Sequence, residues 1–185
     1  MQRHLPLIFI IGLLIAFRIF GSFPGAPLNF QPLTALFFCG AMLAPGWRGL
    51  AISLCIWAIT YPFGIGPVSD LSIFLTTLLG LSGIYLIGYY FSKKSIPALL
   101  LGSGIAALVF HLITNGIAWL GDPIYEKSFT GLWQSLWTGP IGSPIPSWVF
   151  LRNLVAANFI FTGIFAISQV RFSKNSLPLQ TVLAK

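Results

Sequence analysis

Charged residues are scarce in this chain. Only 7% of its 185 residues are charged, and three of those are acids. A soluble domain carries about 25% charged residues. With 56% hydrophobic residues, this composition excludes an ordinary soluble fold and predicts an integral membrane protein.

The lack of acids also excludes most catalytic arrangements. The sequence has no carboxylate pair within an apolar segment, no HExxH zinc motif, no nucleophile elbow and no phosphate-binding loop. A proton or sodium relay would need an acid inside the membrane. We therefore expect a protein that is not an enzyme and that holds no cofactor.

Cysteine and histidine are equally rare, with two of each. Cys39 and Cys55 both fall in apolar segments, which predicts two free, buried thiols rather than a disulfide or a metal site. The ten basic residues are scattered between apolar segments, so nucleic acid is not an expected partner. Membrane orientation explains the net charge of +7 better.

Six apolar segments have the composition of membrane spans, and turn formers or charges separate them. The predicted spans are 5–20, 33–44, 49–61, 71–91, 97–120 and 148–170. Trp133 and Trp137 lie one helical turn apart, which predicts a short interfacial helix before the last span. We expect an all-α polytopic membrane protein with one six-helix transmembrane domain at 1–170. A disordered cytoplasmic tail would follow at 171–185.

The charges give this topology an orientation. With the N-terminus inside, every acid falls in an outer loop and seven of the ten bases fall on the inner side, as the positive-inside rule requires. The inner bases are Arg3, Arg48, Lys93, Lys94, Arg171, Lys174 and Lys185. Both termini are therefore expected in the cytoplasm.

Polar residues recur at the predicted outer ends of the spans. His111, Thr114 and Asn115 share one helical face because they are three and four residues apart. A polar stripe in lipid is costly unless protein, water or ligand pairs with it, so it indicates either a binding site or a helix-packing seam. The candidate substrate-binding residues at this level are Asn29, Gln31, His111, Asn115, Trp119, Tyr125, Arg152, Asn153 and Arg18.

Each of these residues also has a purely structural interpretation. Arg18 and Arg152 lie close enough to the outer face to extend their guanidinium groups into it. His111 taken alone is a packing histidine, bonded to a neighbouring hydroxyl or carbonyl. Asn115 and Asn158 taken singly are interhelical hydrogen-bonding residues. The whole set together favours a site over a seam.

Two segments of the chain resemble a family of uncharacterised small bacterial membrane proteins. The segments are LNFQPLTALFFCGAML and ITNGIAWLGDPIYEKSFTGLW. The matching positions are Asn29, Phe30, Pro32, Thr114, Asn115, Trp119, Tyr125, Gly131 and Leu132. The resemblance implies a multi-pass protein of the bacterial cytoplasmic membrane, and it brings no known function with it.

The six short spans and the outer polar groups also resemble the substrate-binding S components of energy-coupling-factor transporters. In that group, small residues on the first helix contact a transmembrane coupling subunit, and Gly12 and Ala16 match the spacing. The resemblance implies capture of a small solute from the outer side. The implied partners are a coupling subunit and ATPases, besides membrane lipid.

The candidate residues suggest the chemistry of that solute. Amide side chains offer paired donors and acceptors, and Trp119 and Tyr125 offer stacking faces. Arg152 with Arg18 would hold a carboxylate or phosphate bidentately, so an anionic or zwitterionic solute is favoured. The alternative is a non-catalytic structural subunit of a larger membrane complex, in which His111 ligates a haem or another pigment.

Overall fold

The computed structural model describes residues 5–21, 23, 25–43, 46–60 and 71–174. This part of the chain holds seven helices and no strand, so the predicted all-α class is confirmed. The helices are α1 (Leu5–Gly21), α2 (Leu33–Leu43), α3 (Trp47–Thr60), α4 (Leu71–Phe91), α5 (Ile96–Gly121), α6 (Phe129–Leu136) and α7 (Ser147–Lys174). The short α6 falls where the tryptophan pair predicts a helix.

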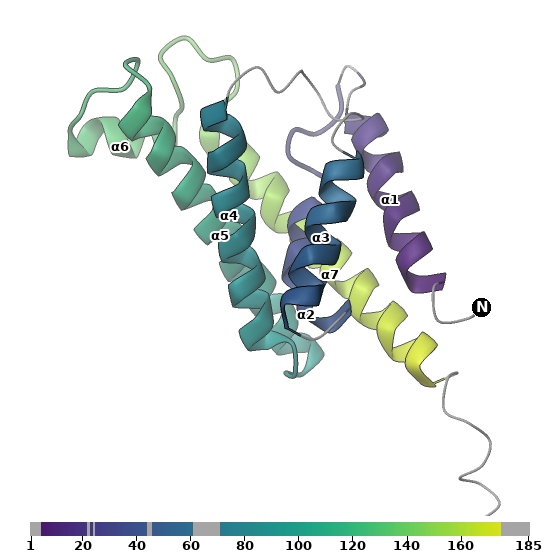
Figure 1. Ribbon diagram of the computed structural model, residues 1–185. Coiled ribbons are helices and arrows are strands. Elements are labelled where there is room, and N and C mark those ends of the chain that lie inside the picture. Colours follow the sequence, from purple (N-terminus) through teal and green to yellow (C-terminus); the bar gives the residue numbers. More distant parts are fainter. Residues whose placement is uncertain (1–4, 22, 24, 44–45, 61–70, 175–185) are drawn as a thin grey trace, which may run out of the picture.

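The first five helices run alternately up and down, α6 lies across one end of the bundle, and α7 returns along its length (Figure 1). The α4 to α5 turn and the end of α7 therefore lie at the end opposite α6. With 26 residues, α5 is about 39 Å long at 1.5 Å per residue.

Within the part of the chain that the structure describes, three helices are long and apolar enough to cross a membrane. Their apolar stretches are Phe74–Phe91, Ile96–Gly121 and Ser147–Ser168. Apolar stretches also occur in α2 and α3, but they are shorter, at Leu33–Met42 and Trp47–Ile59. A hydrocarbon core about 30 Å thick takes about 20 helical residues, so these two helices fall short of that length.

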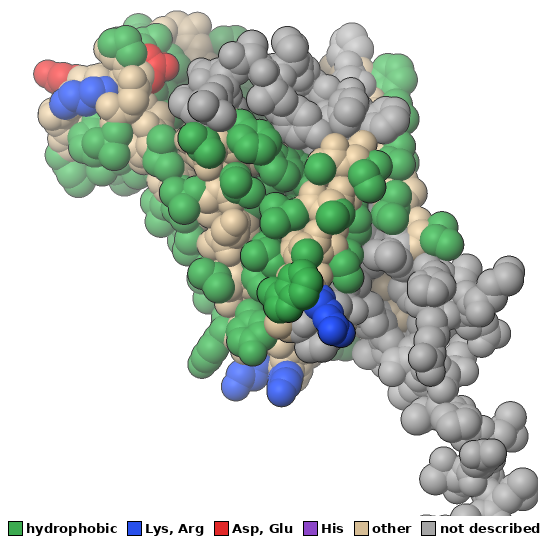
Figure 2. Space-filling model, in the orientation of Figure 1, with side chains coloured by type: hydrophobic (Ala, Val, Ile, Leu, Met, Phe, Trp, Pro, Cys, Tyr) green, Lys and Arg blue, Asp and Glu red, His purple; other side chains and the backbone are tan. Residues whose placement is uncertain are grey.

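Hydrophobic and charged side chains occupy different parts of the molecular surface, as membrane-spanning helices require. Figure 2 shows hydrophobic side chains over the middle of the visible face and charged side chains at its two ends. The exposed Lys93 and Lys94 lie in the α4 to α5 turn, whereas the exposed Asp122, Glu126 and Lys127 lie in the connection from α5 to α6.

The core is built around α2. Leu36, Phe37 and Phe38 are each at most 1% exposed, and residues 33–40 of the helix are all buried because apolar residues lie on every side of it. It packs between α4 and α7, and α4 comes close at Gly88. A Cβ atom at Gly88 would overlap the backbone carbonyl of Phe38. The contact between α2 and α4 therefore depends on this glycine.

Hydrogen bonds of Asn158 join three helices inside this core. The Thr34 hydroxyl donates to Asn158 Oδ1 at 2.6 Å, and Asn158 Nδ2 donates to the carbonyl oxygen of Ser103 at 3.1 Å. Asn158 and Thr34 are buried. The interpretation of Asn158 as an interhelical hydrogen-bonding residue is therefore confirmed for α2, α5 and α7.

Two details differ from the sequence-based expectations. Cys39 is a free, buried thiol as predicted, but Cys55 is exposed on α3, so its predicted burial is wrong. An apolar sequence context predicts that a side chain is shielded from water. Contact with lipid shields it as well as burial inside the protein does. Helix α7 also continues to Lys174, four residues into the predicted tail, while residues 175–185 lie outside the described residues.

The close approach at Gly88 gives a prediction with a control on the same helix. Gly88→Ala should lower the free energy of unfolding by about 1–3 kcal/mol, because α2 and α4 must move apart. Gly83→Ala should be neutral or slightly stabilising, since its Cβ would meet Ile113 Cδ1 at an ordinary 3.6 Å and alanine favours a helix. Thermal unfolding of both variants in one detergent measures the difference, and equal midpoints would contradict the prediction.

Candidate functional site

A cavity of about 250 Å³ lies between the loop before α2, the α6-proximal half of α5 and the start of α7. Its lining residues are Asn29, Phe110, His111, Thr114, Asn115, Ser147, Phe150 and Leu154. The polar stripe predicted on α5 therefore faces this cavity. Three of the nine predicted site residues, Asn29, His111 and Asn115, are brought together there.

The hydrogen bonds of His111 fix the state of its ring. Its Nε2 lies 2.8 Å from the carbonyl oxygen of Leu136, and a carbonyl can only accept, so Nε2 carries the proton. Its Nδ1 lies 3.1 Å from Asn115 Nδ2 and accepts from that amide. The imidazole is therefore neutral with both nitrogens engaged, and ligation of a haem or pigment would require one of these bonds to break.

The same stripe holds α6 in place. Besides the bond from His111 to Leu136, the Ser135 hydroxyl donates to the carbonyl oxygen of Asn115 at 3.1 Å. Ser128 caps the start of α6 by accepting from the Gly131 N–H at 3.1 Å. His111 and Asn115 of α5 therefore both line the cavity and hold α6 against α5.

Asn29 enters the cavity from a loop with an unusual backbone. Its φ is +58°, a left-handed conformation that asparagine and glycine adopt at low cost. The loop is held by Asn153 of α7, whose Nδ2 donates to the carbonyl oxygen of Leu28 at 2.9 Å. Asn153 therefore positions the loop and does not line the cavity.

Trp119, Tyr125 and Gln31 also lie away from the lining. Trp119 donates to the carbonyl oxygen of Glu126 at 2.8 Å, which closes the connection from α5 to α6. Tyr125 is buried in that connection. Burial raises the pKa of its phenol, and the nearby Asp122 carboxylate raises it further.

Of the two predicted arginines, Arg152 does not line the cavity. Arg152 is exposed on α7 and donates to Asn153 Oδ1 from Nε and Nη2, each at 3.2 Å. The side chain of Arg18 lies outside the described residues. Their assignment to the solute stays a prediction.

Sequence reasoning missed the wall of the cavity that α7 supplies. Ser147, Phe150 and Leu154 line it at helical spacing of three and four residues. A search for one face of the sixth span that combines a hydroxyl with apolar residues would have found them. Within the described residues no group of three histidine, cysteine or acidic side chains is arranged to hold a metal ion.

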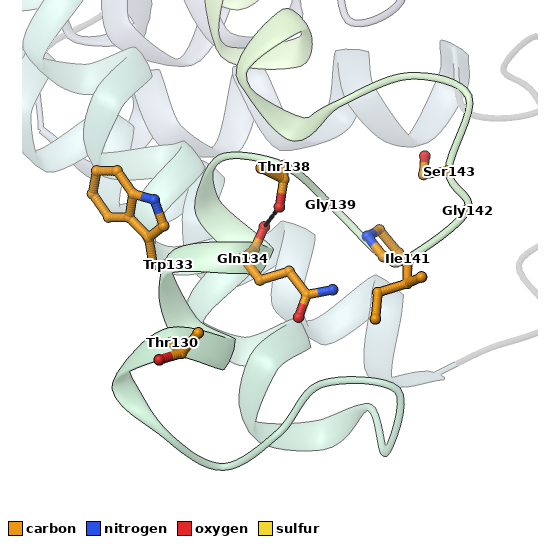
Figure 3. Close-up of a pocket in the computed structure, with 9 residues that line it drawn as sticks. Thr130, Trp133, Gln134, Thr138, Gly139, Ile141, Gly142 and Ser143 are labelled. Carbon is orange, nitrogen blue, oxygen red and sulfur yellow. Dashed lines mark hydrogen bonds between the residues drawn. The ribbon is translucent and has the colours of Figure 1, made fainter.

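A second hollow of about 490 Å³ lies between α6 and the loop that follows it (Figure 3). Its lining includes Trp133, Gln134 and Ile141, and the Thr138 hydroxyl donates to the carbonyl oxygen of Gln134 at 3.4 Å. None of the eight predicted site residues whose side chains the structure describes lines it.

The three helices of membrane-spanning length and composition in the described residues indicate a helical membrane protein. The chain belongs to the family of unknown function DUF6580, which residues 1–178 match. Comparison with curated proteins found no match, and neither did comparison with solved structures. The expected membership of an uncharacterised family is confirmed, while these comparisons do not support the resemblance to S components.

The docking of α6 through His111 gives a second prediction. His111→Phe removes the bond to Leu136 and leaves its carbonyl without that donor, which costs about 1–3 kcal/mol. Exchange of the α6 amides, residues 129–136, should therefore quicken about tenfold or more by hydrogen-exchange mass spectrometry. Leu112→Phe introduces the same ring on the exposed neighbour and should leave exchange unchanged. Equal exchange in both variants would show that the histidine does not dock α6.

Proposed function

We propose that the protein binds a small polar solute in the cavity lined by Asn29, α5 and the start of α7. The observation that carries the proposal is hydrogen-bonding capacity left over at the cavity. Within the described part of the chain, the Asn29 amide, Asn115 Oδ1 and the Ser147 hydroxyl make no hydrogen bond. The Asn29 side chain is exposed and Asn115 is half-buried, so these donors and acceptors are accessible to a bound solute.

The size and lining of the cavity support a particular class of solute. Pockets for drug-sized molecules measure about 300–1,000 Å³, so about 250 Å³ suits a smaller molecule. The lining combines amide, hydroxyl and imidazole groups with two phenylalanines and carries no formal charge. These groups suit an uncharged or zwitterionic solute. An anionic solute would need Arg152 or Arg18 to reach the cavity.

The proposal includes six membrane crossings with both termini in the cytoplasm of a bacterium. The alternating course of the helices supports this count (Figure 1). Protein surrounds α2, so its length need not match the bilayer. Lys93 and Lys94 at one end and the acids near α6 at the other orient the bundle by the positive-inside rule. The cavity then opens towards the outer side.

Uptake of the captured solute would require a separate energising module, because the sequence has no ATPase motif. The resemblance to S components suggests a transmembrane coupling subunit with ATPases. Gly12 and Ala16 of α1 are exposed, which leaves the face that would meet such a subunit open. The alternative of a structural subunit stays a prediction, and its pigment form would have to displace the partners of His111.

The proposed topology is tested by labelling single cysteines in intact bacterial cells. Cys39 and Cys55 are first replaced by alanine, and Lys94→Cys or Ile141→Cys is then introduced at exposed positions near opposite ends of the molecule. A membrane-impermeant maleimide should label the cysteine at 141 in intact cells and the cysteine at 94 only after lysis. The reverse pattern, or equal labelling of both, would contradict the orientation.

The solute site is tested by native mass spectrometry of the protein extracted from its own membrane. We expect the wild type to retain a small polar metabolite. Asn29→Gly keeps the left-handed backbone and removes the amide, so the affinity should fall about tenfold or more, a loss of about 1–3 kcal/mol.

Phe23→Ala is the matched control, because Phe23 is an exposed residue of the same loop that does not line the cavity. It should retain the metabolite as the wild type does. A wild type that carries no small molecule, or equal retention by Asn29→Gly, would remove the assignment. ATPases that co-purify would support the transport role in particular.

A further inference from the structure

Three indole rings and one guanidinium form a row at the α6 end of the molecule. Trp133 and Trp137 stack with centroids 6.0 Å apart and an interplanar angle of 22°, and Trp137 lies 6.4 Å from Trp148 at 30°. The guanidinium carbon of Arg152 lies 5.3 Å from the centre of the Trp148 ring. We call this row of Trp133, Trp137 and Trp148 the tryptophan ladder, with Arg152 at its foot.

Arg152 is held in place without using up its donors. Its Nε and Nη2 both donate to Asn153 Oδ1 at 3.2 Å. Asn153 is only 8% exposed and is itself anchored to the carbonyl oxygen of Leu28. A guanidinium has five N–H donors, so three remain. No acid of the described residues pairs with this exposed cation, whose orientation is fixed by the bonds to Asn153.

The cation stands at the head of an apolar strip on the outside of α7. Phe159, Ile160 and Ile167 follow Arg152 by seven, eight and fifteen residues, which brings them to the same side of the helix. All three are 42–53% exposed. The opposite side of α7, with Leu154, faces the cavity and the core. Arg152 therefore serves a surface that the proposed solute site does not use.

The position of Arg152 along α7 matches the depth of a phospholipid headgroup. Arg152 lies about 8 Å from the start of α7 at 1.5 Å per residue and contacts Trp148, which pairs with the exposed indole of Trp137. Indole rings settle at the level of the headgroups. An arginine just below that level meets the phosphates, and the apolar strip beneath it meets the acyl chains.

We propose that Arg152 and the tryptophan ladder form a binding site for one phospholipid of the leaflet that borders α6. The phosphate accepts hydrogen bonds from the free edge of the Arg152 guanidinium, whose planar fork matches phosphate oxygens. One acyl chain lies along Phe159, Ile160 and Ile167. A soluble phosphate would use the same cation but would gain nothing from this strip, which is why the site is assigned to a lipid.

Native mass spectrometry of the delipidated full chain in a neutral detergent tests the site, with phosphatidylglycerol as the probe. The wild type should retain one phosphatidylglycerol with at least tenfold higher affinity than Arg152→Gln. Arg48→Gln, which removes another exposed arginine, on α3, should retain it as the wild type does. Equal retention by Arg152→Gln and the wild type would overturn the proposal.

Two further arms make the test decisive. Glycerol phosphate at the same concentration should fail to displace the lipid, and displacement would overturn the lipid assignment in favour of a soluble anion. Phosphatidylglycerol with brominated acyl chains should quench tryptophan fluorescence more strongly in the wild type than in Arg152→Gln, and equal quenching would count against the site.

Should Arg152→Gln unfold at a lower temperature than the wild type, Arg152→Lys takes its place. It keeps the charge and loses the planar fork, so it should bind the lipid more weakly than the wild type, and equal binding would overturn the role of the fork. This experiment is independent of the solute, because no metabolite is added and the cavity residues are unchanged.

Discussion

The hydrogen bonds of Asn158 are the constraint on which the arrangement of the bundle depends. Helices in lipid gain little from burying apolar surface against one another, so polar contacts and close packing decide how they lie. Asn158 accepts from Thr34 of α2 and donates to the backbone of α5. It thereby fixes α2, α5 and α7 at one point. Leu154, one turn along α7, then falls on the wall of the cavity.

The polar stripe on α5 is both a packing seam and a cavity wall. His111 and Asn115 bond to each other and, through a side chain and a backbone carbonyl, to α6. These bonds satisfy the imidazole but leave Asn115 Oδ1 at the cavity. One residue can therefore serve both roles, because some of its atoms pack against α6 while another remains available at the cavity. A ligand that engaged Asn115 would act on a residue that also supports α6.

Much of this arrangement follows from local sequence rules, and the rest depends on contacts between distant segments. Helical periodicity places His111, Thr114 and Asn115 on one face, and the structure brings that face to a cavity. The same rules could not reveal that the partner of His111 is the backbone of Leu136. Every residue has a backbone carbonyl, so the sequence does not indicate which one accepts the hydrogen bond. They also could not tell which side of α7 is buried, and the structure buries Asn153 while the neighbouring Arg152 is exposed.

The connection between α6 and α7 is closed at its neck, where the N–H of Trp148 donates to the carbonyl oxygen of Trp137 at 3.0 Å. Gly139 and Gly142 have positive φ within it, and Ile141 is 91% exposed at its tip. A loop whose ends are tied together tolerates added length at its tip without moving the flanking helices. An epitope or a rigid fusion domain can therefore be inserted at the tip. It would serve as a fiducial for aligning images of this small protein in electron microscopy.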